Sequence, residues 1–299
     1  MNLLRTPFTV VDGGLSTALG ELGRASGGLL WTAQLVIDEP DVVVAAHRSF
    51  VEAGAEVIIT SSYQASVAGF EGAGLSRSEA VAALRSTTDL AHRAVDGDAD
   101  VVVAASIGPF GATLGDGSEY HGRYDASWDA VQAFHRERIA VIVDSGPDLI
   151  AVETIPGIIE AEIILDELDR VGAPAGWLTL SCRDGETTCA GDPFAAVVRQ
   201  LELSPALVAI GVNCTAPIHV ESLLRSAAGG PLPFVVYPNH GRTWDAVGEC
   251  WIGDGDDHLS ERAAAWVAAG ARLIGGCCGV GPAGVRGLVA TREALASEG

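Results

Sequence analysis

The segment 272–279, Arg-Leu-Ile-Gly-Gly-Cys-Cys-Gly, constrains what this chain can fold into more than any other stretch. Leu273 and Ile274 are apolar, and two glycines and two adjacent cysteines follow them at once. This order predicts a buried strand whose carboxyl end opens into a tight turn that carries two thiols. Adjacent cysteines seldom form a disulfide with each other, because that bridge imposes a strained geometry. The two thiols are therefore available for other chemistry.

A third cysteine occurs in the same setting, because Cys214 ends the apolar stretch Val-Ala-Ile-Gly-Val-Asn-Cys at 208–214. Three thiolates at the ends of two strands, with no obvious fourth ligand, match the composition of a zinc site that keeps an open position. A free cysteine is usually a small buried hydrophobe, and this alternative stays open for each cysteine taken alone. The combination of Cys214, Cys277 and Cys278 favours a metal site.

The length of the chain, 299 residues, suits a single α/β barrel, which typically takes about 250 residues. No apolar run reaches the roughly 18 residues of a membrane span. The segment 1–7 lacks the apolar block and the cleavage site of a signal peptide. We therefore expect a cytoplasmic protein with no membrane partner, and six cysteines in such a chain suit a reducing compartment.

The charge of the chain argues against nucleic acid as a partner. The formal net charge is −21, and all 18 basic residues are arginines. Such a surface repels phosphate backbones. The simplest interpretation of the acidic surface is solubility, although it also suits cationic ligands.

Eight apolar segments, rich in Val and Ile, recur along the chain without alternating with polar residues. Continuous apolar runs of this kind are typical of parallel strands that are buried on both faces. The segments are 8–11, 55–60, 100–105, 148–153, 176–181, 207–212, 233–237 and 272–275.

Stretches with helical spacing separate these segments. A helix is expected over 41–53, where Glu-Pro precedes it and Gly54 follows it. Apolar faces of later helices are formed by Trp128, Val131, Phe134, His135, Ile139 and Ile142, by Ile158, Ala161, Ile164, Leu165 and Leu168, and by Ala263, Ala264, Val267 and Ala268 before Gly270.

Strand–helix alternation repeated eight times predicts a (β/α)₈ TIM-type barrel, in preference to an open doubly wound sheet. No linker divides the chain, so we expect a single domain over residues 1–299. The longest irregular connections, 108–127 and 239–259, follow strands and should lie at the carboxyl-terminal rim.

Reactive residues of such a barrel lie where strands end, and two carboxylates occupy such positions here. Asp12 follows the first strand and Glu153 ends the fourth. A buried carboxylate is unfavourable unless a cation or hydrogen-bond donors meet it, so the ammonium group of a ligand is a plausible partner. The alternative is that each caps a helix or accepts backbone N–H bonds.

Nine short motifs follow one another along the chain. They are Asp-Gly-Gly-Leu-Ser-Thr at 12–17, Leu-Trp-Thr at 30–32, Ala-Gly-Ala at 53–55, Thr-Ser-Ser-Tyr-Gln at 60–64, Gly-Ser-Glu-Tyr at 117–120, Glu-Thr at 153–154, Val-Asn-Cys at 212–214, Tyr-Pro-Asn at 237–239 and Gly-Gly-Cys-Cys at 275–278. With these motifs in this order, the chain resembles the homocysteine S-methyltransferases, and in particular the zinc-dependent group that uses S-methylmethionine or S-adenosylmethionine. The resemblance runs from about residue 10 to residue 282, and Gly-Gly-Cys-Cys with the upstream Asn-Cys is its most specific part.

The resemblance implies a (β/α)₈ barrel in which three cysteine thiolates hold Zn²⁺ and the sulfur of homocysteine takes the fourth position. It implies the zinc ligands Cys214, Cys277 and Cys278. Asp12 and Glu153 would bind the substrate ammonium, Asn213 would orient the site, and Trp31 and Tyr63 would line the methyl-donor side. For Trp31, core packing is an equal alternative. The segment 117–120 would cover the donor.

The implied chemistry needs no general acid or base. A zinc-bound thiol is a thiolate at neutral pH, and a sulfonium donor leaves as a neutral thioether. An aromatic wall can hold a sulfonium through cation–π attraction. The partners would be small molecules, homocysteine and a sulfonium donor, and S-methylmethionine is the first expectation.

Some features depart from the family or leave alternatives open. His240 is more plausibly a packing residue than a neighbour that tunes the metal, Cys182 is expected to line the site, and Cys189 and Cys250 have no assigned role. A betaine-type donor is an alternative within enzymes, and a non-catalytic thiol-based metal or redox sensor is an alternative outside them. The oligomeric state is open.

Overall fold

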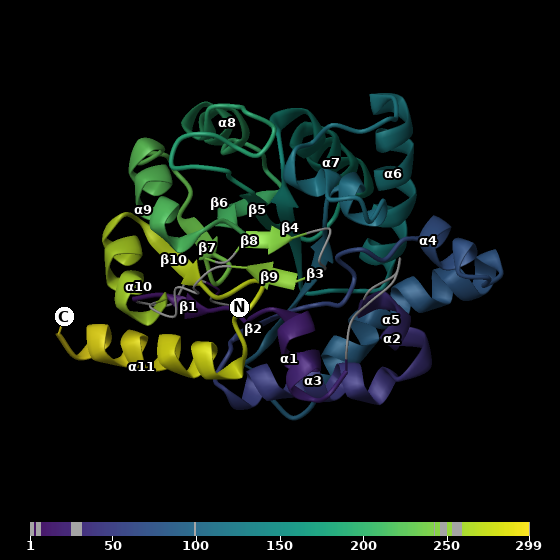
Figure 1. The fold of residues 1–299 in the computed structure, drawn as a ribbon, viewed down its shortest axis with the longest axis horizontal. Coiled ribbons are helices and arrows are strands. Elements are labelled where there is room, and N and C mark those ends of the chain that lie inside the picture. The colour runs from purple at the N-terminus through teal and green to yellow at the C-terminus, as the bar shows by residue number, and fades with distance from the viewer. Residues whose placement is uncertain are drawn as a thin grey trace.

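The computed structural model describes residues 3, 7–24, 32–98, 100–241, 243–245, 250–252 and 259–298. Within these ranges, eight strands form one parallel sheet, and helices surround it (Figure 1). The strands are β1 (Thr9–Val10), β2 (Val57–Ile59), β3 (Val102–Ile107), β4 (Leu149–Ile155), β5 (Gly176–Leu180), β6 (Leu207–Asn213), β7 (Phe234–Tyr237) and β10 (Ala271–Ile274). Each strand coincides with one of the apolar segments identified from the sequence, and the ends of the strand and of the segment differ by at most two residues.

The sheet closes into a barrel. Its strand order is β1-β10-β7-β6-β5-β4-β3-β2, and every pairing is parallel. A parallel bridge between Val11 and Val57 joins the two edges, and the hydrogen bond from Glu56 N to Val10 O (2.8 Å) supports it. This closure confirms the (β/α)₈ prediction and excludes the open doubly wound sheet. That residues 1–299 act as one domain stays a prediction.

Apolar side chains pack on both faces of the sheet, as continuous apolar runs require. The inner face forms a cluster that includes Trp177, Leu149 and Leu273. The outer face packs against the helices through a larger cluster that includes Phe50 and Ile164. A strand buried on both sides has no polar face, which explains why the strands do not alternate in sequence.

The helices follow the strands and return the chain to the start of the next one. In the described ranges they are α1 (Leu15–Glu21), α2 (Thr32–Asp38), α3 (Pro40–Glu52), α4 (Val67–Gly72), α5 (Arg77–Val95), α6 (Trp128–Asp144), α7 (Ile158–Val171), α8 (Phe194–Leu201), α9 (Pro217–Ser226), α10 (Leu259–Ala268) and α11 (Pro282–Glu298).

Local signals set several helix ends. Ser76 and Glu79 form a capping box at the start of α5, and Gly172 ends α7 in the left-handed conformation. The helix expected over 41–53 is α3, one residue earlier at each end. None of the helices in the described part of the chain combines the length and the apolar character that a membrane span needs.

Two expectations need correction. Trp128 is 40% exposed, because it is the first residue of α6 and packs against Tyr124 beside the barrel instead of facing the sheet. The two connections expected to be irregular, 108–127 and 239–259, contain regular structure. The connection 108–127 includes the 3₁₀ turns η1 (Phe110–Thr113) and η2 (Ser118–Tyr120). The connection 239–259 includes an antiparallel pair of strands, β8 (Thr243–Asp245) with β9 (Cys250–Ile252).

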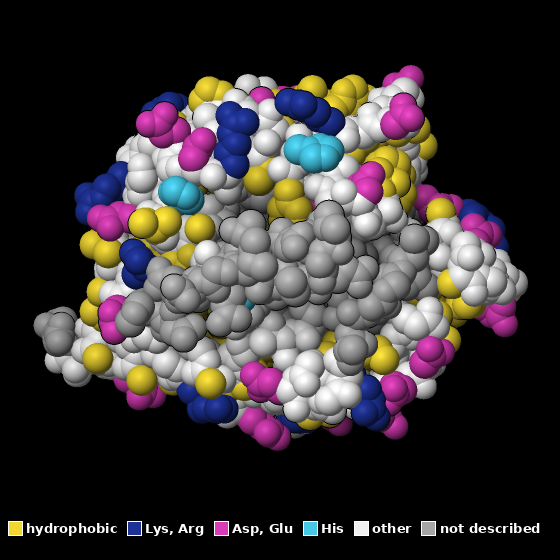
Figure 2. All heavy atoms as spheres, viewed as in Figure 1, with side chains coloured by type: hydrophobic (Ala, Val, Ile, Leu, Met, Phe, Trp, Pro, Cys, Tyr) yellow, Lys and Arg dark blue, Asp and Glu magenta, His cyan; other side chains and the backbone are white. Residues whose placement is uncertain are grey.

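The described surface carries both signs of charge. Figure 2 shows arginine and acidic side chains interspersed on the face that looks toward the viewer. The expectation that nucleic acid is not a partner stays a prediction.

Candidate active site

A pocket opens where the barrel strands end and their loops begin. Its wall comes from the turn after β1, the loop after β2, the ends of β4, β6 and β7, the turn after β10 and one residue of η2. Parallel strands bring residues that are distant in sequence to the same rim. The lining includes Gly14, Tyr63, Glu153, Thr154, Cys214 and Cys277.

The structure brings the three predicted cysteines together at this pocket. Cys278 Sγ lies 3.9 Å from Cys214 Sγ and 3.9 Å from Cys277 Sγ, and the three sulfurs are within 4.8 Å of one another. Zinc binds thiolates at about 2.3 Å in tetrahedral geometry, which places ligand sulfurs roughly 3.8 Å apart. The spacing therefore fits three corners of a tetrahedron, with one corner open to another ligand.

The pKa values of these thiols are shifted in different directions. Hydrogen bonds from Cys214 and Cys277 lower the pKa of Cys278 well below its ordinary value. Hydrogen bonds with Cys277 and Cys278, and then burial, raise the pKa of Cys214. A group that already favours one thiolate is suited to a soft cation, because the cation would stabilise the remaining thiolates as well.

The backbone around the cysteines is held in an unusual conformation. Cys214 has a φ of 48°, in the left-handed region that non-glycine residues rarely adopt. Its N–H donates to Tyr237 O at 3.1 Å, and its carbonyl accepts from Asn239 Nδ2 at 3.3 Å. Cys277 N donates to Pro238 O at 2.8 Å. The loop after β7 therefore supports both cysteine segments.

Close packing explains why residue 14 is a glycine. A Cβ on Gly14 would lie 2.6 Å from Cys277 O, so the turn after β1 packs directly against the backbone of the cysteine turn. Only glycine allows that approach. This contact brings the end of β1, with its carboxylate, beside the sulfurs.

Asn213 acts through Thr154. Its Oδ1 accepts from Thr154 N at 2.7 Å, and its Nδ2 donates to Thr154 Oγ1 at 2.8 Å and approaches Cys277 Sγ at 4.0 Å. Thr154 has a φ of 59° and is strained like Cys214. Asn213 thus fixes the end of β4 against the end of β6, and its role in orienting a substrate stays a prediction.

The two predicted carboxylates lie close to each other and to Cys277, although only Glu153 lines the pocket. Asp12 Oδ2 accepts from Ile59 N at 2.9 Å, whereas buried Oδ1 has no hydrogen-bond partner within the described ranges. Burial raises the pKa of Asp12 well above its ordinary value, and neighbouring Glu153 adds to the increase. Burial likewise raises the pKa of Glu153 to about 7. Within the described residues neither carboxylate forms an ion pair, and the favourable influence of Arg138 on Glu153 is smaller than that of burial.

Residues that the sequence analysis missed surround Glu153. Ser106 Oγ donates to Glu153 Oε1, and a hydrogen bond from the Tyr237 side chain also lowers the pKa of this carboxyl. Trp177 Nε1 donates to the Tyr237 hydroxyl at 3.0 Å, which fixes the phenol from below. Ser106 and Tyr237 were visible as strand-end residues, but no sequence signal linked them to Glu153.

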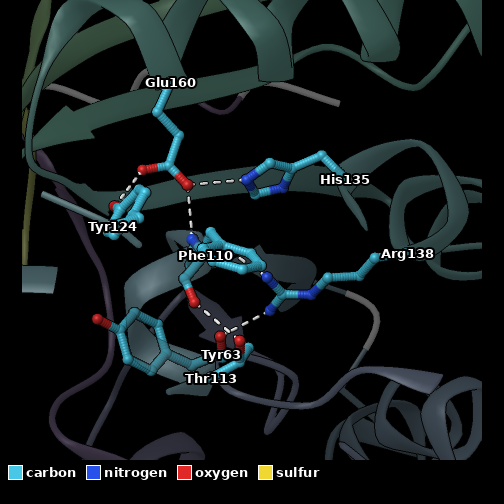
Figure 3. A network of polar contacts seen from close by, with 8 residues as sticks. Tyr63, Phe110, Thr113, Tyr124, His135, Arg138 and Glu160 are labelled. Atoms are coloured by element: carbon cyan, nitrogen blue, oxygen red, sulfur yellow. Dashed lines mark hydrogen bonds and ion pairs between the residues drawn. The ribbon is translucent and has the colours of Figure 1, made fainter. Parts of the chain in front are cut away.

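Tyr63, predicted on the donor side, lines the pocket and is held by buried Arg138 of α6. The guanidinium of Arg138 donates to Tyr63 O at 2.6 Å (Figure 3). It also donates to Ser62 O at 2.6 Å and to Gly108 O at 2.8 Å. A Cβ on Gly108 would lie 2.6 Å from the ring of Tyr63, so this wall is tightly packed. The available signal for Arg138 was an arginine on the same helical face as His135, Ile139 and Ile142.

Glu160 of α7 joins the long loop after β3 to the helices. Its Oε1 accepts from Phe110 N at 2.6 Å and lies 2.9 Å from His135 Nε2. Its Oε2 accepts from the Tyr124 hydroxyl at 2.5 Å (Figure 3). His135, predicted as part of an apolar face, is therefore buried in a polar network that anchors this loop.

The same loop reaches the pocket through Tyr120, whose hydroxyl lies 3.9 Å from Cys214 Sγ. That the segment 117–120 covers a donor stays a prediction. Trp31, the other aromatic residue assigned to the donor side, lies outside the described residues.

The remaining candidates stand apart from the sulfurs or support them. His240 N donates to Cys278 O at 3.0 Å, and its ring packs against Gly279, where a Cβ would lie 2.2 Å away. These contacts favour the packing interpretation. Cys182 is buried and Cys189 half-buried, and neither lines the pocket. The expectation that Cys182 lines the site is therefore wrong, because its side chain packs into the apolar core. The side chain of Cys250 is not among those described.

Comparison with known proteins agrees with this geometry. The sequence model of the family described as homocysteine S-methyltransferase matches residues 9–291. The chain belongs to the homocysteine S-methyltransferase family. It is therefore a methyltransferase, and the non-catalytic sensor that the cysteines alone left open is set aside.

Relatives in this family match over nearly their whole length. The chain is 39% identical to homocysteine S-methyltransferase 1 of Arabidopsis thaliana, over 93% of this chain and 91% of the relative. It is 38% identical to homocysteine S-methyltransferase of Escherichia coli strain K12, over 94% of each.

Solved structures give the same result. The metallated form of the homocysteine methyltransferase MmuM from Escherichia coli superimposes with a TM-score of 0.85 at 36% identity, over 96% of each chain. A methyltransferase from Methanosarcina mazei, at 11% identity and a TM-score of 0.60, shares the fold alone.

Proposed function

We propose that this enzyme transfers a methyl group from a sulfonium donor to the thiol of L-homocysteine, forming methionine, with one zinc ion held by Cys214, Cys277 and Cys278. The observation that carries the proposal is the spacing of the three sulfurs, at 3.9 Å for two of the pairs, which suits tetrahedral zinc with an open corner. The relatives named homocysteine S-methyltransferase and the metallated Escherichia coli structure support it.

When bound, zinc supplies a Lewis acid that lowers the pKa of a substrate thiol, so that the thiol is ionised at neutral pH. The chain's own residues have a different task, which is to place that substrate. Asp12 and Glu153 offer buried carboxylate oxygens near the sulfurs, and the ammonium group of homocysteine would be a cation for them to pair with.

Asn213 and Thr154 keep this arrangement rigid. The amide of Asn213 holds the strained end of β4, where Glu153 lies, beside the end of β6, where Cys214 lies. The distance between the ammonium pocket and the sulfurs is thereby fixed by the barrel. A fixed distance of this kind lowers the entropic cost of aligning the thiol with the donor.

The methyl transfer needs no residue that donates or accepts a proton. The ionised homocysteine sulfur forms a bond to the methyl carbon, and the bond from that carbon to the donor sulfur breaks. The electron pair of the broken bond stays on the donor sulfur, which becomes a neutral thioether. The thiol proton is released to solvent when homocysteine binds. Alignment and exclusion of water are therefore the main requirements.

Tyr63 would form part of the donor wall, together with Trp31 as predicted from the sequence. An aromatic ring attracts a sulfonium by about 0.5–2 kcal/mol. Tyr63 suits this role because it lines the pocket and Arg138 holds its backbone.

The deciding experiment incubates zinc-loaded enzyme with homocysteine and, in separate reactions, S-methylmethionine, S-adenosylmethionine or betaine, and measures methionine. We expect methionine from a sulfonium donor, with S-methylmethionine the best. Methionine from betaine alone would replace the donor assignment. No methionine from any of the three would overturn the proposed reaction.

A further inference from the structure

Tyr120 brings a hydroxyl group from the rim loop, residues 108–127, to the cysteine sulfurs. It is the last residue of η2, and it lines the pocket together with all three cysteines. Its hydroxyl oxygen lies 3.9 Å from Cys214 Sγ, the same distance that separates Cys214 Sγ from Cys278 Sγ. A phenol has an ordinary pKa of about 10, so at neutral pH it keeps its proton and is the donor toward a thiolate.

A comparable contact comes from β6. Asn213 Nδ2 donates to Thr154 Oγ1 and also approaches Cys277 Sγ at 4.0 Å. Within the described part of the chain, Cys277 and Cys214 therefore each have a neutral side-chain donor nearby. Donors of this kind orient the ligands of a metal and share their negative charge, and their loss typically costs about 10- to 100-fold in metal affinity.

The packing of the rim loop sets the position of η2. A Cβ on Gly111 would lie 2.5 Å from Glu119 N, so η1 and η2 pack backbone against backbone. Gln64 Nε2 donates to Ala112 O at 3.0 Å, which joins η1 to the loop after β2. Glu160 of α7 holds the start of η1 from the other side. The segment that carries Tyr120 is therefore supported by two neighbouring parts of the barrel.

The chain just after Tyr120 is held as well. Gly122 has a φ of 64°, and a Cβ there would lie 3.2 Å from Pro156 and from Ala190. Its N–H donates to Ser118 O at 2.8 Å, which closes the turn around Tyr120. Both ends of η2 are thus anchored, and the barrel fixes the approach of the hydroxyl to Cys214.

The hydroxyl contact separates two possible tasks of Tyr120. A residue that only covers a methyl donor acts through its ring, and phenylalanine would serve as well. A hydroxyl beside Cys214 Sγ acts on a sulfur that the proposed function assigns to the metal. The two tasks differ in which group of the side chain matters.

We propose that the hydroxyl of Tyr120 donates a hydrogen bond to the Cys214 thiolate and thereby helps to retain the metal, so that the rim loop is part of the metal site. Tyr120 is then a positioning residue that acts through Cys214. The inference rests on the proposed function, because it takes Cys214 as a zinc ligand, and it adds a residue outside the barrel strands to that site.

The test measures the Kd for zinc of the wild type and of Tyr120→Phe, by competition with a chromophoric chelator in the absence of both substrates. The substitution removes the hydroxyl and keeps the ring, and we expect the Kd to rise about ten-fold. Tyr124→Phe is the matched control, since it makes the same change on the same loop, where the hydroxyl bonds to Glu160 instead of sulfur. Phe110 N still anchors the loop on Glu160 in this control, so its Kd should equal that of the wild type.

Cobalt substitution gives a second readout that a change in packing alone would not move. The thiolate-to-Co²⁺ charge-transfer absorption reports the electron density on the sulfur ligands. Loss of an O–H···S hydrogen bond raises the energy of the sulfur lone pairs. The band should therefore move to longer wavelength in Tyr120→Phe and stay in place in Tyr124→Phe.

Three results would contradict this inference and leave the proposed function intact. The first is a zinc Kd and a cobalt band that are unchanged in Tyr120→Phe. The second is an equal rise of the Kd in Tyr120→Phe and Tyr124→Phe, which would assign the effect to the packing of the loop. The third is a higher KM for the donor at unchanged zinc affinity, which would assign Tyr120 to the donor. A wild-type enzyme that binds no zinc would instead refute the metal assignment in the proposed function.

Discussion

The two sides of the pocket are built differently. The strand-end side carries Cys214, Cys277 and Glu153, with Asp12 buried behind it, and these residues lie at the ends of hydrogen-bonded barrel strands. The loop side carries Tyr63, Gln64 and η2, and it depends on the helices α6 and α7 for support through Arg138 and Glu160. The first side is part of the barrel, whereas the second is attached to it.

This difference suggests a division of labour. The strand-end side has rigid geometry, which suits the position of an ion and of the thiol that meets it. The loop side is joined by side-chain hydrogen bonds to backbone carbonyls and amides, so its shape can change while the barrel stays intact. We therefore expect changes on the strand-end side to affect metal and homocysteine, and changes on the loop side other than at Tyr120 to affect the donor alone.

Removal of the metal should have the largest effect, because it acts on the strand-end side as a whole. Dialysis against a strong chelator should lower methionine formation by on the order of 10³-fold or more, since the substrate thiol is then mostly protonated. Addition of one equivalent of zinc should restore it. Activity that survives complete metal removal, checked by elemental analysis, would contradict the assignment.

Asp12→Asn should come next in size. Loss of a charged hydrogen bond to the substrate ammonium should raise the KM for homocysteine by roughly 10- to 100-fold, with zinc content unchanged and the KM for the donor within about two-fold. Steady-state kinetics with each substrate varied, together with zinc analysis, measure this. An equal loss of zinc would place Asp12 among the groups that hold the metal.

Arg138→Lys tests the loop side. Lysine keeps the charge but cannot reach the carbonyls of Ser62, Tyr63 and Gly108 together, so the wall around Tyr63 should loosen. We expect the KM for the donor to rise about five- to ten-fold, since a buried hydrogen bond is worth about 1 kcal/mol, while the KM for homocysteine stays unchanged.

The neighbouring Arg136 supplies the control for this variant. It lies on the same helix, is half exposed and pairs with Glu167, away from the pocket. Arg136→Lys should leave both KM values unchanged. Equal increases in the two KM values of Arg138→Lys would show that the sides of the pocket are not independent.

Protonation of His47 in α3 should change the free energy of unfolding without affecting either side of the pocket. His47 is fully buried, and burial lowers its pKa from 6.5 to about 4. The folded protein therefore binds this proton less readily than the unfolded chain. The contribution of His47 to the free energy of unfolding is constant above about pH 6.5. This free energy falls by about 3 kcal/mol in total as the pH drops from about 6.5 to about 4.

Denaturant unfolding of the wild type and of His47→Leu between pH 4 and 7.5 measures this effect. The variant should lose that part of the pH dependence, and the difference between the two curves should grow as the pH falls. Parallel curves would show that His47 is not the group responsible. Kinetic constants for both substrates at pH 7.5 should not change.

The strand-end side was largely predictable from the sequence. A buried strand that ends in cysteine or carboxylate places an unusual residue at a known position of a barrel, so Asp12, Glu153, Cys214, Cys277 and Cys278 could be identified before the fold was seen. The eight strands were predictable as well, because short continuous apolar runs rich in Val and Ile are typical of parallel strands that are buried on both faces.

The loop side was not predictable to the same degree. Arg138 shares a helical face with apolar residues, but nothing in the sequence identifies the partners of Arg138 and Glu160, which include backbone groups of distant loops. Tyr120 belonged to a recognised motif, but its contact with a cysteine sulfur depends on how the loop packs after folding. The strained Thr154 likewise has no sequence signal, because its φ is imposed by Asn213 and the meeting of two strand ends.

The proposed chemistry depends most directly on whether the three sulfurs hold one ion. Elemental analysis of purified wild type and of Cys214→Ser, Cys277→Ser and Cys278→Ser, with Cys182→Ser and Cys189→Ser as controls, measures this. We predict about one zinc per chain in the wild type and both controls, and loss of zinc in each of the three ligand variants. Full zinc content in any of the three, in a correctly folded variant, would contradict the assignment of these cysteines as ligands.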